Sequence, residues 1–324
     1  MNRLYWASMD ASLLPTAWRF RSPQFSDLQA VTDLIVACDE ADFGKVDTTT
    51  ADLLAEWQRP GFDLSTNSRL LLAPDNRLAG YTDFWLKPDE VYISHNTCIH
   101  PSYRNLVGLL PLYRMGEEIA HRHFSGRSGV IRIVSLQENR SILLETEGYQ
   151  AVRVELRMQI DLDAPPPTPS WPDDFHLRPF VQSQDAHAVH EIIQTAFRAI
   201  PNHQDVPFEA WEQFMLKRTD FEPTLMFVVE NNGEIVAVAA CFDYPDTGWV
   251  RQLAVKKEYR GQGLGLALLR YAFAEFCQRG RRLAGLVVDS QNPTGAPQLY
   301  LRAGMVPTEK IVTYKKWVGL NIDT

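Results

Sequence analysis

The chain has 324 residues, of which 45% are hydrophobic and 22% are charged. At roughly 150 residues per domain this length predicts two compact domains, and the composition excludes a disordered or fibrous protein. Lys and Arg total 32 against 40 Asp and Glu, a formal net charge of -8, which argues against a nucleic-acid or anionic membrane partner. Without a leader pattern in the first thirty residues or an apolar run of 18, we expect a soluble, cytoplasmic protein.

The first half of the chain predicts a mixed α/β domain over residues 1–162. An amphipathic helix is expected over 26–38, followed by a hairpin of strands over 69–73 and 78–85. A further strand, a helix, a strand, a helix and a closing strand are expected after it. His121 and His123 lie two apart on a predicted helix and cannot share a face, so no metal site is predicted.

A proline-rich segment then divides the chain almost in half. Five prolines lie between residues 161 and 174, which excludes a helix or a central strand and predicts a linker over 163–175. The second half, 176–324, repeats the pattern of the first, with a helix over 185–198 and a hairpin over 225–242. A shift of 156 residues places Tyr103-Arg104 on Tyr259-Arg260. The fold class is therefore α/β with a mixed sheet, in two tandem domains.

The most informative segment of the second half is an expected strand over 249–255, a glycine-rich turn and a helix. The turn holds Gly261, Gly263 and Gly265 just after Arg260. Residues without a β-carbon let the unpaired amides at a helix start approach a ligand, and the helix dipole and an arginine favour an anion there. The turn therefore predicts a phosphate or pyrophosphate site.

The spacing separates three kinds of phosphate loop. No Gly-Lys-Ser/Thr ending is present, which excludes a Walker-type loop, and the third glycine comes one residue too early for a dinucleotide fingerprint. The remaining pattern, Arg-x-x-Gly-x-Gly, resembles the acyl-coenzyme A loop of the GNAT superfamily of N-acetyltransferases. A second segment, Val287 to Asn292 followed by Ala296, Leu299-Tyr300 and Gly304, is similar to that family's second signature.

The resemblance implies acetyl-coenzyme A as the cofactor and assigns roles in holding it. By this carry-over the pantetheine arm would pair with the backbone of Leu253, Ala254 and Val255. The pyrophosphate would be held by the amides of Arg260, Gly261, Gln262, Gly263, Leu264, Gly265 and Leu266. Asn292 would contact the cofactor or merely form a turn, and Tyr300 would be either the general acid that protonates the leaving thiolate or a packing residue.

The first half lacks the residues that this chemistry needs. Under the same shift, Asn105, Val107 and Leu109 face the three glycines, and Leu144 faces Tyr300. The β-carbons of Val107 and Leu109 would crowd a pyrophosphate, so we expect the first domain to be a degenerate repeat. Two such halves in one chain resemble the two-domain architecture of mycothiol synthases.

The acceptor and the general base are not fixed by the sequence. Asp243 and Asp289 end the strands on either side of the motif, and each is either a base or a loop-capping carboxylate. In the segment 197–211, His203, Asp205 and Trp211 are candidates to line the acceptor site. The alternative for Trp211 is a place in the core, and the alternative for His203 is a solvated loop.

The sequence therefore predicts an N-acetyltransferase that moves acetyl from acetyl-coenzyme A to a primary amine of a small molecule. An acyl-coenzyme A-binding regulatory or assembly module without transfer activity and a protein N-acetyltransferase remain the alternatives. The sequence does not indicate the oligomeric state.

Overall fold

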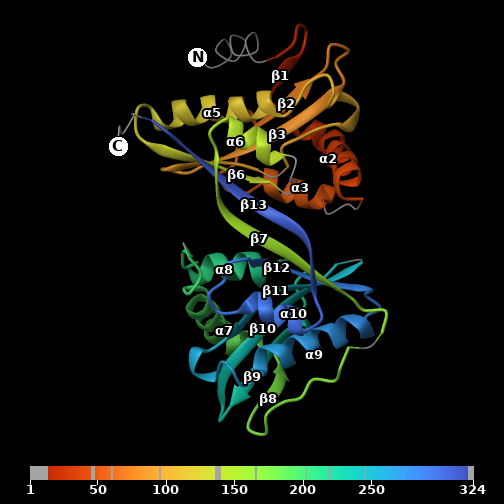
Figure 1. Ribbon diagram of the computed structural model, residues 1–324, viewed down its shortest axis with the longest axis vertical. Coiled ribbons are helices and arrows are strands. Elements are labelled where there is room, and N and C mark those ends of the chain that lie inside the picture. The colour runs from red at the N-terminus through yellow and green to blue at the C-terminus, as the bar shows by residue number, and fades with distance from the viewer. Residues whose placement is uncertain are drawn as a thin grey trace. The chain divides into compact units, whose positions relative to one another are not determined.

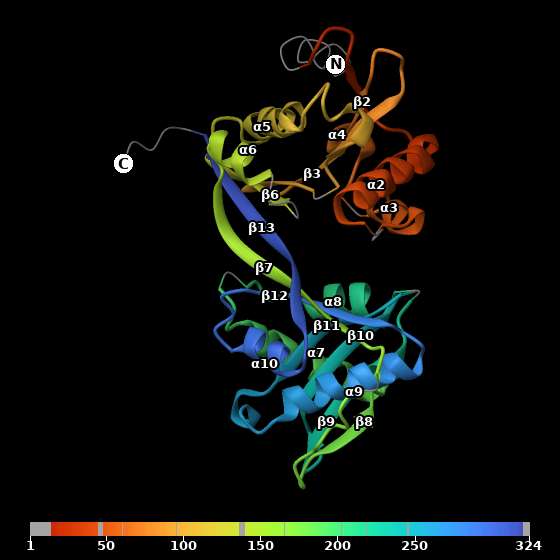
Figure 2. The ribbon, with the colours of Figure 1, turned by 45° about the vertical axis from the view of Figure 1, so that its right-hand side comes forward.

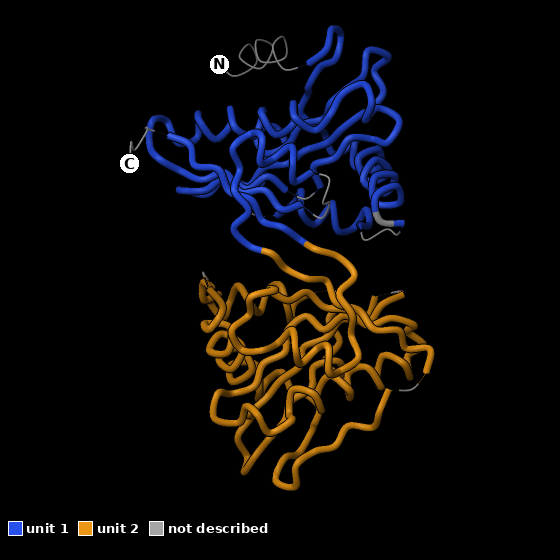
Figure 3. Tube along the Cα trace, viewed as in Figure 1, with its two compact units in different colours: residues 1–153, 311–324 blue, residues 154–310 orange. Residues whose placement is uncertain are grey.

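The structure, a computed structural model, describes residues 14–319 except 45–47, 60, 95, 136–139, 165, 202, 219 and 245. The chain divides into two compact units, residues 1–153 with 311–324 and residues 154–310 (Figure 3). Both units combine helices with a mixed sheet (Figure 1), which confirms the predicted α/β class. Among the described helices, none is long and apolar enough to cross a membrane.

Unit 1 is built on a mixed sheet with helices on both faces. Its sheet follows the order β1-β2-β3-β4-β6-β13, with β5 paired to β3. The elements, labelled in Figures 1 and 2 apart from β4 and β5, are β1 (Arg19–Arg21), α2 (Leu28–Phe43), α3 (Thr50–Trp57), α4 (Leu64–Asn67), β2 (Ser68–Leu72), β3 (Leu78–Leu86), β4 (Glu90–Ile93), β5 (Cys98–Ile99), α5 (Leu110–Phe124), β6 (Gly129–Ser135) and α6 (Arg140–Thr146). The last part of β13 (Val306–Val318) completes the sheet.

Unit 2 holds the segment that resembles an acetyltransferase. Its strands follow the order β7-β12-β11-β10-β9-β8. The elements are β7 (Gln150–Asp161), β8 (His176–Pro179), α7 (Gln182–Phe197), α8 (Phe208–Met215), β9 (Met226–Asn231), β10 (Glu234–Asp243), β11 (Thr247–Val255), α9 (Leu264–Gln278), β12 (Leu283–Asp289) and α10 (Ala296–Arg302). The described residues of the proline-rich segment between β7 and β8 carry no helix or strand, as the sequence predicts.

Two apolar layers cover the faces of the unit 2 sheet. One packs α9 and α10 against Ala239, Val250 and Leu286, and the other packs α7 and α8 against Val238 and Ala254. The side chains of a strand alternate between faces, so neighbouring residues of β10 contribute to opposite layers. The sheet is therefore buried on both sides where it carries the glycine-rich turn.

The closing strands correct the expectation that each half of the sequence forms its own domain. Residues 312–318 of β13, from the second half, pair with β6 in unit 1. Residues 155–161 of β7, from the first half, pair with β12 in unit 2. Each unit thus contains the closing strand of the other half, and its boundary lies inside β7 and β13 and not in the linker over 163–175.

Candidate active site

The strands β11 and β12 separate next to the glycine-rich turn. Their parallel ladder joins residues 247–249 of β11 to residues 283–285 of β12, although the strands run on to Val255 and Asp289. Arg251 forms a bulge, since Ala240 of β10 faces Gln252 while Cys241 faces Val250. A bulge bends its strand and increases the local twist. Beyond Trp249, β11 therefore has an edge that β12 does not occupy.

Residues of β11 alternate between turning their backbone N–H and C=O toward β10 and turning them toward this open edge. Lys256 N–H donates to the carbonyl of Val236 at 2.9 Å, in register with the antiparallel ladder of β10 and β11. In such a ladder alternate residues turn their N–H and C=O toward the partner strand. Ala254 therefore bonds toward β10, whereas Leu253 and Val255 turn their backbone groups to the open edge. Of the three residues predicted to pair with pantetheine, Leu253 turns both backbone groups to this edge and Val255 its N–H, because the Val255 carbonyl accepts a bond from Arg260 Nε.

The turn before α9 has the backbone that glycine makes accessible. Gly261 and Gly263 have φ values of 79° and 88°, which L-residues with a side chain rarely adopt. The first helical bond runs from Ala267 N–H to the Gly263 carbonyl at 3.0 Å, so the earlier amides lie outside the helical ladder. Residues 261–263 are exposed. The turn therefore presents amides to solvent at the positive end of a 15-residue helix.

The residues that follow these glycines pack against the core and hold the turn in place. Leu264 is 1% exposed and lies in the core, with Leu266 packed against the same cluster. A β-carbon on Gly265 would lie 3.1 Å from Leu299 Cδ2. The third glycine therefore allows close packing of α9 on α10, the helix that carries Tyr300. Gln262, between Gly261 and Gly263, is exposed.

Arg260 keeps its charge available at this turn. Its Nε donates to the Val255 carbonyl at 3.1 Å, and its side chain is exposed. In the part of the chain that the structure describes, Arg260 has no carboxylate partner. Arg104 makes the same bond to Ile99 at 3.1 Å, but its guanidinium also binds the carboxylate of Asp42.

The corresponding loop of the first half is closed. Val107 is 4% exposed and packs in an apolar cluster of unit 1, and its amide and that of Leu106 both donate to the Tyr103 carbonyl at 2.9 Å. Among described residues, none between 104 and 109 has a positive φ. The amides of Leu106 and Val107 are therefore engaged within the loop, and Leu144, opposite Tyr300 in the repeat, is fully buried.

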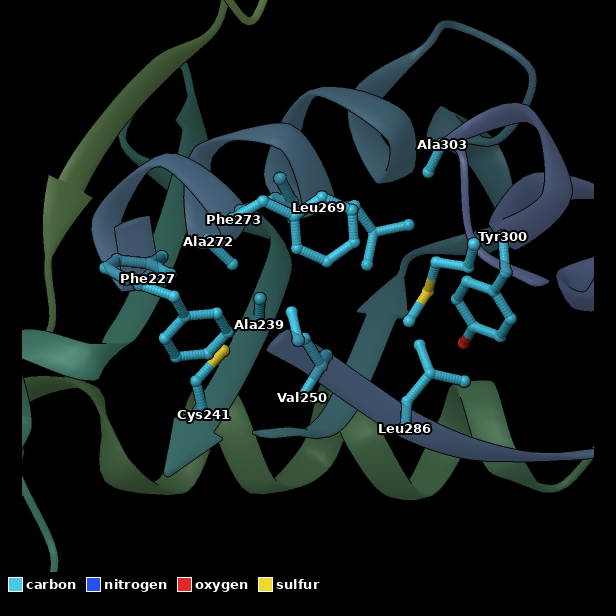
Figure 4. Close-up of a cluster of buried hydrophobic side chains, with 14 of the residues drawn as sticks. Phe227, Ala239, Cys241, Val250, Leu269, Ala272, Phe273, Leu286, Tyr300 and Ala303 are labelled. Carbon is cyan, nitrogen blue, oxygen red and sulfur yellow. The ribbon is translucent and has the colours of Figure 1, made fainter. Parts of the chain in front are cut away.

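Tyr300 lies inside the core on α10. It is 8% exposed, and Figure 4 shows its hydroxyl pointing toward Leu286 of β12. The hydroxyl makes no hydrogen bond to any described residue, and burial raises its pKa to about 12. The group therefore stays protonated at neutral pH.

The other predicted site residues have structural partners. Asn292 Oδ1 accepts bonds from the amide and the hydroxyl of Thr294 at 2.9 and 2.6 Å, which leaves its Nδ2 group as the possible ligand contact. Asp289 Oδ1 accepts the Gln291 amide at 2.8 Å and so caps its loop. Asp243 is held by the Arg281 guanidinium at 2.5 and 3.0 Å. Neither carboxylate is an unengaged base.

The segment before α8 differs in part from the expectation. Trp211 is fully buried, as predicted, and its indole N–H donates to Gln252 Oε1 at 3.1 Å. His203 lies in the loop before α8, as predicted, but its side chain is only 17% exposed and so is not fully solvated. Asp205 forms an ion pair with Arg198.

Sequence reasoning missed the residues that β7 brings to this sheet. Arg157 lies 5.2 Å over the Trp249 ring, and Trp249 covers Gly285, where a β-carbon would lie 2.7 Å from Trp249 Cζ3. Both side chains lie on the face opposite α9, where the two strands begin to separate. The sequence predicts a strand at β7 but not which strand it pairs with, because that pairing depends on the tertiary structure.

Comparison with known proteins agrees with this geometry. Residues 186–305 match the Acetyltransferase (GNAT) family. A GCN5-related N-acetyltransferase from Sphaerobacter thermophilus is 31% identical in sequence, with a TM-score of 0.79 over 96% of this chain and 99% of that one. A mycothiol acetyltransferase from Thermobispora bispora is 29% identical over 261 residues, 76% of this chain and 83% of the relative. A tandem GNAT protein from the clavulanic acid biosynthesis pathway, 16% identical, shares the fold with a TM-score of 0.72 over 94% of this chain and 99% of that one.

The separated strands, the amide-lined turn and the matching relatives define an acyltransferase that uses acetyl-coenzyme A. The chain belongs to the GCN5-related N-acetyltransferase family, with two such domains in tandem.

Proposed function

We propose that unit 2 transfers acetyl from acetyl-coenzyme A to a primary amine of a small molecule. The observation that carries this proposal is the open edge of β11 beside the amide-lined turn. An extended pantetheine arm would pair with the backbone of Leu253 and Val255, and the pyrophosphate would accept bonds from the amides of residues 260–266. The exposed guanidinium of Arg260 adds charge at that end, and Asn292 Nδ2 would donate from the loop after β12.

The reaction needs one proton to leave the amine and one to reach the sulfur. After the ammonium has lost one proton, the neutral amine nitrogen attacks the thioester carbonyl, a C–N bond forms, and the C–S bond breaks as Tyr300 donates its hydroxyl proton to the thiolate. The nitrogen then loses its second proton, and water returns a proton to the Tyr300 oxygen. A lysine-like ammonium has a pKa near 10.4, so its deprotonation at pH 7 costs roughly 4 kcal/mol. Because Asp243 and Asp289 are engaged, we infer that water carries this proton to solvent.

The face opposite α9 supports a small acceptor. The Arg157 guanidinium lies over the Trp249 ring and forms an ion pair with Glu309, and the Trp211 indole donates to Gln252 on the side toward α8. An aromatic ring beside paired charges would contact one ring or chain of a ligand.

Replacing Tyr300 by phenylalanine is expected to lower kcat by about 10²- to 10⁴-fold, because the leaving thiolate loses its proton donor. The affinity for acetyl-coenzyme A should change less than about twofold, since only the hydroxyl is removed. The measurement is release of free thiol from acetyl-coenzyme A with a panel of small primary amines, together with a calorimetric titration. Tyr271→Phe on α9 is the matched control and should retain full turnover.

Three outcomes would overturn parts of this proposal. Equal turnover of Tyr300→Phe and wild type would remove Tyr300 from the mechanism. Acetyl-coenzyme A binding without thiol release for any amine would favour a module without transfer activity. Acetylation of intact proteins but not of free amines would make the chain a protein N-acetyltransferase.

A further inference from the structure

Two buried cysteines lie side by side in unit 1, although they come from distant parts of the chain. Cys38 on α2 is 3% exposed, and Cys98 on β5 is 4% exposed. Both side chains belong to the apolar cluster in which α2 and α3 cover β2, β3 and β5. Their thiol groups hydrogen-bond to each other. Because all four cysteines of the chain are free thiols, this contact brings two reduced sulfurs together.

A single backbone carbonyl holds Cys38 and a positive charge next to each other. Cys38 Sγ donates to the carbonyl of Ile99 at 3.3 Å, and Arg104 Nε donates to the same carbonyl at 3.1 Å. The guanidinium of Arg104 also hydrogen-bonds to the Cys38 sulfur and binds the carboxylate of Asp42. The side chain of Arg104 is 35% exposed. Cys38 therefore lies one side chain below the protein surface, beside a cation.

These neighbours make Cys38 the stronger acid of the two thiols. The pKa of Cys38 is lowered, because Cys98 and Arg104 both donate hydrogen bonds to its thiolate and the charge of Arg104 attracts it. Burial and the carboxylate of Asp42 oppose this change without cancelling it. The pKa of Cys98 is raised by its hydrogen bond to Cys38 and by burial. The thiolate is the nucleophilic form of cysteine, so Cys38 supplies the attacking sulfur.

Unit 2 has no counterpart of this pair. Under the shift of 156 residues, Gln194 and Ala254 stand in the places of the two cysteines. Arg104 corresponds to Arg260, which is exposed at the glycine-rich turn of unit 2. In unit 1 the equivalent arginine is turned onto a carboxylate and a thiol instead. The thiol pair is therefore a feature of unit 1 alone and is independent of the transfer reaction proposed for unit 2.

We propose that Cys38 and Cys98 form a reversible oxidation site, which hydrogen peroxide converts to a disulfide between α2 and β5. The Cys38 thiolate attacks one peroxide oxygen, an S–O bond forms, and the O–O bond breaks as the leaving oxygen takes up a proton and departs as water. The sulfur of Cys98 then attacks the Cys38 sulfenic acid, an S–S bond forms, and the S–O bond breaks. The hydroxide that leaves takes the Cys98 proton as a second water. The two thiols lose two electrons, and the peroxide gains them.

The test treats the folded full chain with hydrogen peroxide, removes the peroxide with catalase, denatures the chain and alkylates the remaining thiols with iodoacetamide. We expect the mass of the chain to show two alkylated cysteines instead of four and the loss of two hydrogen atoms. Peptide mapping should find Cys38 joined to Cys98, while Cys241 and Cys277 of unit 2 are both alkylated. Treatment with dithiothreitol should restore all four thiols.

Serine variants separate the roles of the two sulfurs. Cys98→Ser should stop at the sulfenic acid of Cys38, which dimedone labels, because the second thiol is missing. Cys38→Ser should leave Cys98 reduced and unlabelled. Cys277→Ser, which changes a half-buried cysteine on α9, is the matched control and should form the same disulfide as wild type. The mass change of wild type needs no variant, so the test holds even if a substitution in the core of unit 1 prevents folding.

A stability measurement gives an independent readout of the cross-link. A disulfide restricts the unfolded chain, so oxidised wild type should have a higher Tm than the reduced protein, and hydrogen exchange should slow in α2 and β5. Peroxide should not raise the Tm of Cys98→Ser. Four alkylated cysteines after treatment of the folded wild type would show that the pair only fills the core. A disulfide between two chains, or one that includes Cys241 or Cys277, would place the oxidation elsewhere. Either result would overturn the proposal.

Discussion

Gly263→Val is expected to weaken acetyl-coenzyme A binding by at least about 100-fold, or roughly 2.7 kcal/mol. Gly263 has a φ of 88°, a region that disfavours residues with a β-carbon by about 1–2 kcal/mol and β-branched residues more strongly. Valine should relax to a negative φ, which turns the amides of residues 261–266 away from their common direction. Because several phosphate contacts depend on that direction, they should be lost together.

The control for Gly263→Val is Gly233→Val in the turn between β9 and β10. Gly233 has a φ of 80°, and at both glycines no heavy atom lies within 4 Å of the position that a β-carbon would take. The two variants should lose similar stability, but only Gly263→Val should lose binding in a calorimetric titration. Equal binding by both variants would remove the turn from the cofactor site.

The stoichiometry of the same titration tests the closed loop of unit 1. Because Val107 is buried and the amides of Leu106 and Val107 bond within their loop, we expect one site per chain. Two sites in wild type, with one remaining in Gly263→Val, would show that residues 104–110 also hold a cofactor.

Tyr314→Ala is expected to destabilise unit 1 by about 3–5 kcal/mol, although residue 314 belongs to the second half of the sequence. Tyr314 is 3% exposed in the core of unit 1 and faces Ile133 of β6 in the register of the ladder. Its removal should leave a cavity next to β6 and α5. Trp317 on the same strand is 74% exposed, so Trp317→Ala should change stability by less than about 0.5 kcal/mol.

Hydrogen exchange measured by mass spectrometry locates the effect of Tyr314→Ala. Protection should fall in β6 and α5 and remain in α9. Met158 of β7 belongs to the first half of the sequence but is 1% exposed in the core of unit 2. Met158→Ala should therefore reduce protection in β12 and α9. Loss of protection in unit 2 upon Tyr314→Ala would contradict the finding that the closing strand of the second half belongs to unit 1.

Much of the candidate site was readable from the sequence because it is local. Arg260, the three glycines and the start of α9 lie within six residues, and their conformations follow from backbone sterics and helix ends. The duplicated pattern likewise indicated that Val107 replaces a glycine in the first half. The α/β class and the tandem family follow from the same motifs and from the alternation of strands and helices.

Tertiary structure decided everything that depends on which strands are neighbours. The sequence pattern of β7 and β13 predicts a strand but not its partner, because both carry the same kind of alternation and pairing is set by contacts far apart in the chain. The separation of β11 from β12, the free backbone of Leu253 and the position of Arg157 over Trp249 all follow from those pairings.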